Sequence, residues 1–358
     1  MGNLFKSDKV FCLILWLILG ELSSPGHNLW FLTFFQFIPF FYVIKKYPKE
    51  WIINSIIFGI FFYVLYYRWL IHPVKYIEAP IFIGITNVIL MGIYQTIYFI
   101  IFTAFFRFSK NNLFISPIIW GILEIIRTHF LTGFPWGEIS YNLYCKPQLI
   151  QLANFINSEG ISIFVIFINI FLFNFFVLNK KLKFVGILII LLFISSNFYL
   201  YHIYKPQKVN LKIALIQGNI PEEEKLNDKN AKLIIHEYEK LSKNIKANLI
   251  VWPEAIYIIP FQNDNSSLKR ELLNFVMNNK INLIFGSPTI EFDLYEQKYR
   301  YYNSMFLITS NLKIFRYDKI KLVPFGEYTP YKKFFFFVNK IVPGEDYSSG
   351  KNVKLFKK

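Results

Sequence analysis

The sequence predicts two parts: a multi-span α-helical membrane domain over residues 1–205, followed by a water-exposed α/β domain over residues 206–358. Two observations predict this division. Hydrophobic residues make up 54% of the chain and charged residues only 17%, against roughly a quarter charged in ordinary soluble domains. Residues 1–205 hold 22 charged side chains, whereas the shorter remainder holds 40. This composition excludes a purely soluble protein and a disordered one.

The net charge of +16 does not indicate a nucleic acid partner, because it is divided evenly, +8 each, between the two parts. The cysteine count excludes further classes. Cys12 and Cys145 are the two cysteines of the chain, too few for a disulfide framework or a cysteine-rich metal cluster.

Apolar stretches in the first part predict about seven membrane spans, since a helix needs about 20 apolar residues to cross the bilayer core. The candidates are 10–22, 29–44, 51–70, 80–106, 116–128 with its flanks, 161–178 and 184–200. The alternative for the first stretch is a cleavable signal peptide, because Lys6 and Lys9 precede it. The spans that follow at once favour a membrane anchor.

The distribution of positive charge predicts a cytoplasmic N-terminus. With that orientation ten lysines and arginines fall inside and four outside, which follows the positive-inside rule. Seven crossings then deliver residues 206–358 to the outer face, the periplasm of a Gram-negative cell. We therefore predict a multi-pass inner-membrane protein whose second domain is periplasmic.

One predicted membrane segment carries charged residues, which are costly there and often functional. Glu124 and Arg127 lie three residues apart, on one helical face, where they are able to pair. A structural ion pair at the helix end is the alternative interpretation. The following run, Gly133-Phe-Pro-Trp136, is typical of an interfacial turn with aromatic anchors.

Strands and helices alternate from residue 209, which predicts an α/β layer. The expected strands are 209–217, 249–252, 281–285 (ended by Gly286), 302–309 and 313–317, and the expected helices are 229–246 and 267–279. The last two strands flank a turn at Ser310–Asn311 and are expected to pair.

Two of these strands end in residues with catalytic chemistry. Glu254 follows the strand 249–252 and is placed to act as a general base. Lys319 follows the last strand and is able to stabilise an oxyanion. Taken singly, an ordinary loop glutamate and a surface lysine are the better explanations, so the assignment depends on finding both residues.

Together these motifs resemble the apolipoprotein N-acyltransferase family, whose periplasmic domain belongs to the nitrilase superfamily. The matching pieces are Trp120–Arg127 with Gly133–Trp136, Gln217–Pro221, Trp252–Ala255, and Lys319 followed by Leu322–Tyr328. They run in the family's order over almost the whole chain. The resemblance implies a nitrilase-like αββα sandwich for residues 206–358 and a Glu–Lys–Cys site.

The resemblance also implies residue roles and a reaction. Glu254 matches the general base, Lys319 the lysine that steadies the tetrahedral intermediate, and Glu327 a carboxylate that holds this lysine. Substrate-binding positions are matched by Gln217, Trp252 and Trp136. The implied reaction carries an acyl chain from a phospholipid, typically phosphatidylethanolamine, through an enzyme thioester to the diacylglyceryl-cysteine of an apolipoprotein. It implies a monomer that needs neither a metal nor a soluble cofactor.

The sequence departs from the family pattern at the nucleophile. The family's cysteine follows the Leu322–Tyr328 motif, whereas no cysteine follows Cys145 here. Residues 342–350 still resemble the stretch before that cysteine. We therefore expect the rest of the domain and a closing helix to be absent, as in a fragment, a split gene or a degenerate product. We also expect the chain alone to form no acyl-enzyme.

Two other functions stay open at this stage. The missing cysteine favours a membrane-anchored nitrilase-like protein that binds without catalysing. A membrane amidase of the same superfamily would act on a small soluble amide, but the predicted spans and the Gly133–Trp136 loop favour lipid substrates. Few charged residues in the spans and no inverted repeat argue against a transporter.

Overall fold

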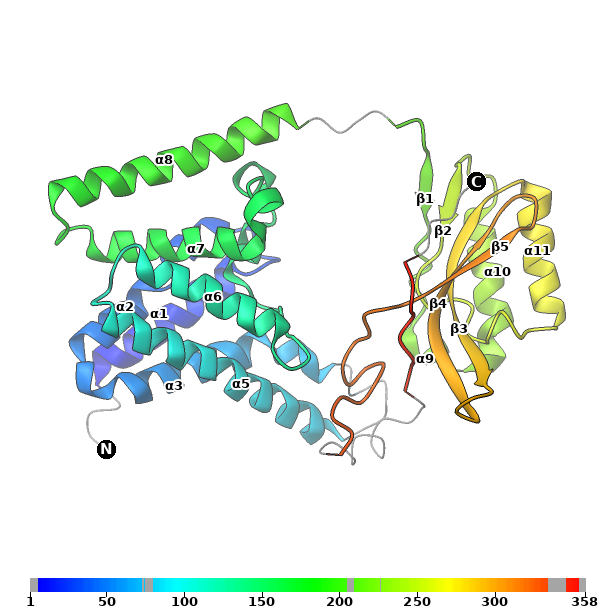
Figure 1. Cartoon of the computed structure of the whole chain (residues 1–358), viewed down its shortest axis with the longest axis horizontal. Coiled ribbons are helices and arrows are strands. Elements are labelled where there is room, and N and C mark those ends of the chain that lie inside the picture. The colour runs from blue at the N-terminus through cyan, green and yellow to red at the C-terminus, as the bar shows by residue number, and fades with distance from the viewer. Residues whose placement is uncertain are drawn as a thin grey trace. The chain divides into compact units, whose positions relative to one another are not determined.

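The computed structural model describes residues 6–72, 74, 80–204, 209–225, 227–333 and 346–353. The chain forms two compact units, Met1–Pro206 and Gln207–Lys358. We call them the helical unit and the sheet unit, after the elements that Figure 1 shows in each. A helical part followed by an α/β part is the fold class that the sequence predicts. Residues 342–345 of the stretch 342–350 lie outside the described residues.

The helical unit consists of α-helices joined by short 3-10 turns. The described helices are α1 (Ser7–Ser23), α2 (Ile38–Lys46), α3 (Trp51–Tyr66), α5 (Ile81–Phe108), α6 (Ile115–His129), α7 (Ala153–Asn174) and α8 (Lys180–Ile203). The 3-10 turns are η1 (Trp30–Phe34), η2 (Pro48–Glu50), η3 (Arg68–Ile71), η4 (Ile139–Leu143) and η5 (Pro147–Leu149).

Within the described residues, four helices are long and apolar enough to cross a membrane: Pro48–Tyr66, Ile81–Phe108, Ala153–Asn174 and Lys180–Ile203. The remaining α-helices are shorter, with 17 residues in α1, 9 in α2 and 15 in α6. The expected span 29–44 is divided, because η1 ends at Phe34 and α2 begins only at Ile38. Seven crossings and their orientation therefore stay a prediction.

The faces of α6 show that the helical unit is organised for a lipid environment. Ile118 and Ile122 are exposed, whereas Glu124 and Arg127 are buried. A helix in water buries its apolar side chains and exposes its charged ones, and α6 does the reverse. This arrangement is expected where lipid replaces the solvent.

The core of the helical unit is largely aromatic. Trp16 of α1 meets Phe37 edge to face, with ring centroids 4.6 Å apart. Asn169 of α7 accepts a hydrogen bond from the Phe37 backbone N–H at 2.9 Å and donates one to the Thr33 carbonyl at 2.9 Å. These bonds satisfy a carbonyl of η1 and the N–H of the residue just before α2.

The sheet unit is built on a mixed five-stranded sheet in the order β1–β2–β3–β4–β5. Its strands are β1 (Ile213–Leu215), β2 (Leu249–Val251), β3 (Leu283–Asp293), β4 (Lys298–Ile308) and β5 (Ile314–Asp318). The first three strands are parallel, and β3, β4 and β5 are antiparallel. The short helices α9 (Glu222–Lys225) and η6 (Asp228–Asn230) follow β1.

Helices α10 (Ala231–Ser242) and α11 (Ser267–Asn279) pack on one face of the sheet (Figure 1). Ile235 and Leu272 of these helices are buried with Ile250 and Leu283 of the strands. The described residues of the sheet unit form one helix layer on one sheet. Because β2, β3 and β5 run in the same direction, the carboxyl ends of β2 and β5 lie at the same end of the sheet.

Strand β3 is longer than the sequence predicts. We expected it to end before Gly286, but it continues to Asp293 and pairs with β4 over its whole length. Pro288 is tolerated in this strand because β2 pairs with β3 only as far as Ile284. Beyond that point one side of β3 has no neighbouring strand in the described sheet, and a proline there removes no ladder hydrogen bond.

Candidate active site

The turn after β2 holds Glu254 against β3. The Gly286 N–H donates to the Pro253 carbonyl at 3.2 Å, and the Gly286 carbonyl accepts from the N–H groups of Ile256 and Tyr257, both at 3.1 Å. A Cβ on Gly286 would lie 2.5 Å from the Ala255 nitrogen and 2.8 Å from the Glu254 Cα. Only glycine allows the turn to approach the strand this closely.

Lys319 comes directly after β5 and is fixed through its backbone. Its N–H donates to the Asn303 carbonyl at 2.9 Å, and its carbonyl accepts from the Gly350 N–H at 2.9 Å. Glu327 lies in a tight turn eight residues further on, where its side chain accepts from the Val323 N–H at 2.6 Å. Backbone hydrogen bonds therefore fix the main chain of Lys319, and a backbone N–H helps to orient the carboxylate of Glu327.

The structure brings Glu254, Lys319 and Glu327 together, although they are far apart in the sequence. The Lys319 Nζ lies 2.8 Å from Glu327 Oε1 and 3.5 Å from Glu254 Oε1. Asn303 of β4 joins them, since its Nδ2 donates to Glu254 Oε1 at 2.5 Å and to Glu327 Oε1 at 2.6 Å. We call these four residues the carboxylate–lysine cluster.

Burial distinguishes the two carboxylates. The side chain of Glu327 is 12% exposed, that of Lys319 32% and that of Glu254 64%. Burial by itself raises the pKa of Glu327, but hydrogen bonds from Lys319, Val323 and Asn303 outweigh it and hold the pKa below its ordinary value. Glu327 is therefore the charged inner partner of the lysine, while Glu254 faces the solvent.

The lysine is held in its charged form. Partial burial by itself lowers the pKa of Lys319, but the hydrogen bond to Glu327 and the charge of Glu254 outweigh it, so the pKa lies above its ordinary value. A lysine that stays protonated at neutral pH offers hydrogen bonds and positive charge to a developing oxyanion and is unable to serve as a base. Glu254 is the accessible group that can accept a proton.

The remaining predicted residues belong to other elements of the two units. Trp252 is 2% exposed, and its indole N–H donates to Ser242 Oγ at 2.8 Å. We expected it to contact substrate, but it is a core residue under α10.

Gln217 is exposed two residues beyond β1. Trp136, Cys12 and Cys145 belong to the helical unit, where Cys12 is buried.

Comparison with known proteins decides the family. The apolipoprotein N-acyltransferase N-terminal domain matches residues 18–171, and the carbon-nitrogen hydrolase domain matches residues 212–348. A relative from Geobacter metallireducens, named apolipoprotein N-acyltransferase, is 30% identical over 356 residues, which cover 94% of this chain and 68% of the relative. A relative of the same name from Aquifex aeolicus is 33% identical over 349 residues, which cover 95% and 74%. The chain belongs to the apolipoprotein N-acyltransferase family.

Membership of this family makes the chain a membrane-bound acyltransferase with a nitrilase-like second part, which confirms the predicted family and fold class. The whole carboxylate–lysine cluster lies within the residues that match the carbon-nitrogen hydrolase domain. Among the described residues, no three His, Cys, Asp or Glu side chains are grouped as metal ligands would be.

Sequence reasoning missed Asn303, although a signal for it was present. Strands β4 and β5 pair around the turn at Ser310–Asn311, so that Ser304 lies opposite Asp318. Counting one residue further on each strand places Asn303 opposite Lys319. The predicted hairpin therefore already put an amide beside the predicted lysine.

In the segment 120–139, Glu124 takes part in a buried hydrogen-bond network, whereas Trp136 is exposed. Glu124 Oε1 accepts from the Trp120 indole N–H at 2.9 Å and from the Ile139 N–H at 3.4 Å. Arg127 Nη2 lies 4.0 Å from Glu124, beyond hydrogen-bond distance, and its Nη1 donates to Gln95 at 3.2 Å. Glu124 thus anchors the loop after Trp136 more than it pairs with Arg127.

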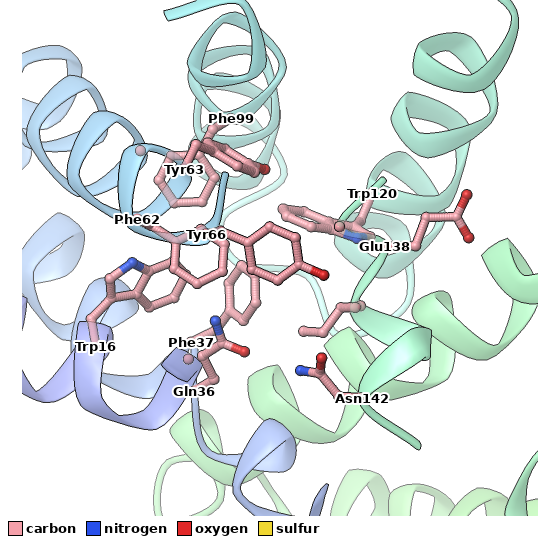
Figure 2. Close-up of a pocket in the computed structure, with 14 residues that line it drawn as sticks. Trp16, Gln36, Phe37, Phe62, Tyr63, Tyr66, Phe99, Trp120, Glu138 and Asn142 are labelled. Carbon is pink, nitrogen blue, oxygen red and sulfur yellow. The ribbon is translucent and has the colours of Figure 1, made fainter. Parts of the chain in front are cut away.

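A small cavity of about 20 Å³ lies beside this loop (Figure 2). Aromatic rings from several helices line it, among them Trp16, Phe37, Phe62, Tyr66, Phe99 and Trp120. Glu138 and Asn142 line it from the loop side. Space of this size accommodates about one water molecule, so the cavity is too small to serve as a lipid site.

Proposed function

We propose that the chain catalyses the amide-forming half of N-acyl transfer to the α-amine of an N-terminal diacylglyceryl-cysteine of an apolipoprotein. In the whole reaction a phospholipid is the acyl donor and a thioester is the intermediate, and the thiol of that thioester is neither Cys12 nor Cys145. The observation that carries this proposal is the carboxylate–lysine cluster, in which a solvent-facing Glu254 lies 3.5 Å from a charged Lys319. The name shared by the relatives supports the acceptor. The apolar helices support lipid substrates.

In the proposed amide-forming step, Glu254 takes a proton from the attacking α-amine as nitrogen bonds to the thioester carbonyl carbon. Lys319 stabilises the resulting oxyanion, and Glu327 keeps the lysine in place. Collapse of the tetrahedral intermediate then breaks the carbon–sulfur bond, Glu254 returns its proton to the departing sulfur to give the thiol, and the amide remains on the acceptor. Gln217 and Trp136 are proposed to contact the substrates.

The thiol is assigned to neither cysteine of the sequence. Cys12 is buried in α1, and Cys145 lies in the loop before η5. We therefore expect residues 1–358 to form no acyl-enzyme by themselves. Incubation of the purified chain with radiolabelled phosphatidylethanolamine checks this. A hydroxylamine-sensitive protein adduct would contradict the assignment.

The amide-forming half of the reaction is testable on this chain with an external thioester. The purified chain in phospholipid nanodiscs is mixed with a palmitoyl thioester of N-acetylcysteamine and a diacylglyceryl-cysteine peptide. We expect amide formation to be faster than without protein, and Glu254→Gln and Lys319→Met to remove roughly a hundredfold or more of the acceleration. Glu296→Gln, a substitution at the β3–β4 turn, is the matched control.

The same assay separates the proposed enzyme from a non-catalytic binding protein. A chain that retains the peptide on the nanodiscs but does not accelerate amide formation would contradict the proposal and favour binding alone. We further propose that the chain acts as a monomer in the inner membrane, with its sheet unit on the periplasmic side.

A further inference from the structure

Residues 346–350 run beside the carboxylate–lysine cluster and take the place of β5 as a neighbour of β4. Strand β5 pairs with β4 only as far as Asp318. Beyond that point Tyr347 forms a parallel bridge with Tyr301 of β4. The Ser348 N–H donates to the Tyr301 carbonyl at 2.6 Å. We call residues 346–350 the strap.

The strap bonds to the main chain of both partners of the ion pair in the cluster. The Gly350 N–H donates to the Lys319 carbonyl at 2.9 Å. Three residues earlier, the Tyr347 N–H donates to the Glu327 carbonyl at 2.7 Å. One short segment therefore connects the backbones of Lys319 and Glu327 without using the charge of either side chain.

Side chains at both ends hold the strap itself. At its start, Asp346 Oδ2 accepts from the Thr329 N–H at 3.1 Å and lies 2.9 Å from Lys332 Nζ. Near its end, Ser349 Oγ donates to the carbonyl of Ile320, the residue after the cluster lysine. The position of the strap thus does not depend on any single contact.

Gly350 lies where a side chain has no room. It is buried, and a Cβ on it would lie 2.2 Å from the carbonyl oxygen of Asp318 and 2.8 Å from the carbonyl carbon. Asp318 is the residue directly before Lys319. Its carboxylate is held by the Ser304 hydroxyl at 2.6 Å and by Arg316 Nε at 2.6 Å. A side chain at position 350 would therefore displace either the strap or the backbone that carries the lysine.

We propose that the strap positions Lys319 against Glu327 for amide formation and that Gly350 is the residue on which this positioning depends. A partly exposed ion pair by itself tolerates a range of geometries, whereas an oxyanion requires its donor at hydrogen-bond distance. The backbone bonds of the strap supply that precision. As an account of catalysis, this inference rests on the proposed function.

The alternative role for the strap is to cover the edge of β4, as sheet edges need. The two roles predict different losses. Damage to an edge cover lowers stability, and activity falls only with the folded fraction. Damage to a positioning element lowers kcat in a chain that stays folded.

The test is Gly350→Ala in the full chain, in the nanodisc thioester assay. We expect kcat for amide formation to fall roughly tenfold to a hundredfold and KM for the peptide to stay unchanged, because the oxyanion forms only after the peptide has bound. Ser349→Ala removes one side-chain bond and keeps the backbone bonds, so we expect roughly a two- to fivefold loss. Asn352→Ala, at an exposed position just beyond the strap, is the matched control.

A second measurement needs no catalysis. Burial by itself lowers the pKa of Lys319, but the bond to Glu327 and the charge of Glu254 outweigh it and hold the pKa above 10.5. Trace acetylation with acetic anhydride at pH 9, read by mass spectrometry, reports the unprotonated fraction of each lysine. We expect Gly350→Ala to acetylate Lys319 roughly threefold faster or more, because the lysine is released from Glu327. Lys298 in the same chain is the internal reference.

The outcomes separate this inference from the proposed function. Unchanged kcat and unchanged Lys319 acetylation in Gly350→Ala would overturn the inference. A kcat that falls only in step with the unfolded fraction, measured by chemical denaturation, would reduce the strap to an edge cover and overturn it as well. If the unchanged chain accelerates no amide formation, the proposed function fails, and the acetylation rates still decide whether the strap holds Lys319 against Glu327.

Discussion

At the scale of single residues, one amide decides the geometry of the candidate site. Asn303 is the only side chain of the cluster without a charge, yet it donates to both carboxylates, at 2.5 and 2.6 Å. Two carboxylates this close repel one another unless donors lie between them. Asn303 and Lys319 supply these donors from neighbouring strands.

Replacement of Asn303 is therefore expected to separate the carboxylates. Asn303→Ala removes the two hydrogen bonds that Nδ2 donates to the carboxylates. It is expected to slow amide formation in the thioester assay roughly tenfold to a hundredfold. Asn303→Asp adds a third carboxylate at the same place and is expected to be slower still. Asn279→Asp, at the exposed end of α11, makes the same change of charge and serves as the control. Equal rates for Asn303→Ala and Asn303→Asp would contradict this role.

The pKa shifts predict how the cluster contributes to stability. The pKa of Glu327 lies below its ordinary value of 4.5 in the folded chain. Its contribution to stability is therefore present above pH 4.5 and is lost as the pH falls through the lower, folded-state pKa. The pKa of Lys319 lies above 10.5, so its contribution is complete below that pH and decreases only in stronger alkali.

The Glu327→Gln variant tests this dependence. Its thermal unfolding midpoint in detergent is expected to lie below that of the unchanged chain at pH 7, and the difference is expected to shrink as the pH falls below about 4.5. Glu291→Gln, on β3 outside the cluster, is the control. A difference between the unchanged chain and Glu327→Gln that stays constant from pH 7 to pH 3.5 would contradict the assignment.

At the scale of elements, the contact between the β2 turn and β3 places Glu254. Gly286 both donates to and accepts from this turn, and the turn leaves no room for a side chain on the strand. The position of a catalytic candidate is thus decided by a residue that performs no chemistry. The pairing of β3 with β4 places Gly286 opposite Met305 and Asn303 opposite Pro288, two residues further along the strand.

We expect Gly286→Ala to displace the Glu254 turn. Its Cβ would overlap backbone atoms, which move less readily than side chains, so we expect a destabilisation of about 1–3 kcal/mol and a large loss of amide formation. Gly326→Ala is the matched control, because its nearest contact would be 3.5 Å from Val323. Chemical denaturation and the thioester assay measure the two effects. A fully active Gly286→Ala chain would contradict this account.

At the scale of the whole molecule, the proposed function requires the sheet unit to lie outside the cell membrane. The positive-inside rule predicts this orientation, and single-cysteine labelling tests it. In a chain with Cys12→Ser and Cys145→Ser, Leu233→Cys on α10 and Phe176→Cys between α7 and α8 are both well exposed positions, at 70% and 91%.

A membrane-impermeant maleimide added to intact spheroplasts is expected to label Leu233→Cys and to leave Phe176→Cys unlabelled until the cells are lysed. Labelling of both positions after lysis shows that both thiols are reactive. The opposite pattern would put the carboxylate–lysine cluster in the cytoplasm and contradict the proposed substrates.

Much of this molecule follows from the sequence by itself. The division near residue 206, the apolar helices and the order of the strands follow from charge density and hydrophobic periodicity, which are local properties. Glu254 and Lys319 were identified as candidates because each follows a predicted strand, whereas Glu327 came from the resemblance to the family. The helix 267–279 was predicted to the residue, and in the structure the side chain of Ser266 caps its start.

Only the tertiary structure decided the rest. The burial of Trp252, the bridging role of Asn303 and the position of the strap beside Lys319 depend on contacts between segments far apart in the chain. Periodicity says which face of an element is buried, but not which partner it meets. The length of β3 was likewise decided by its neighbours, because a glycine and a proline that interrupt a strand in isolation are tolerated where β4 supplies eleven paired residues.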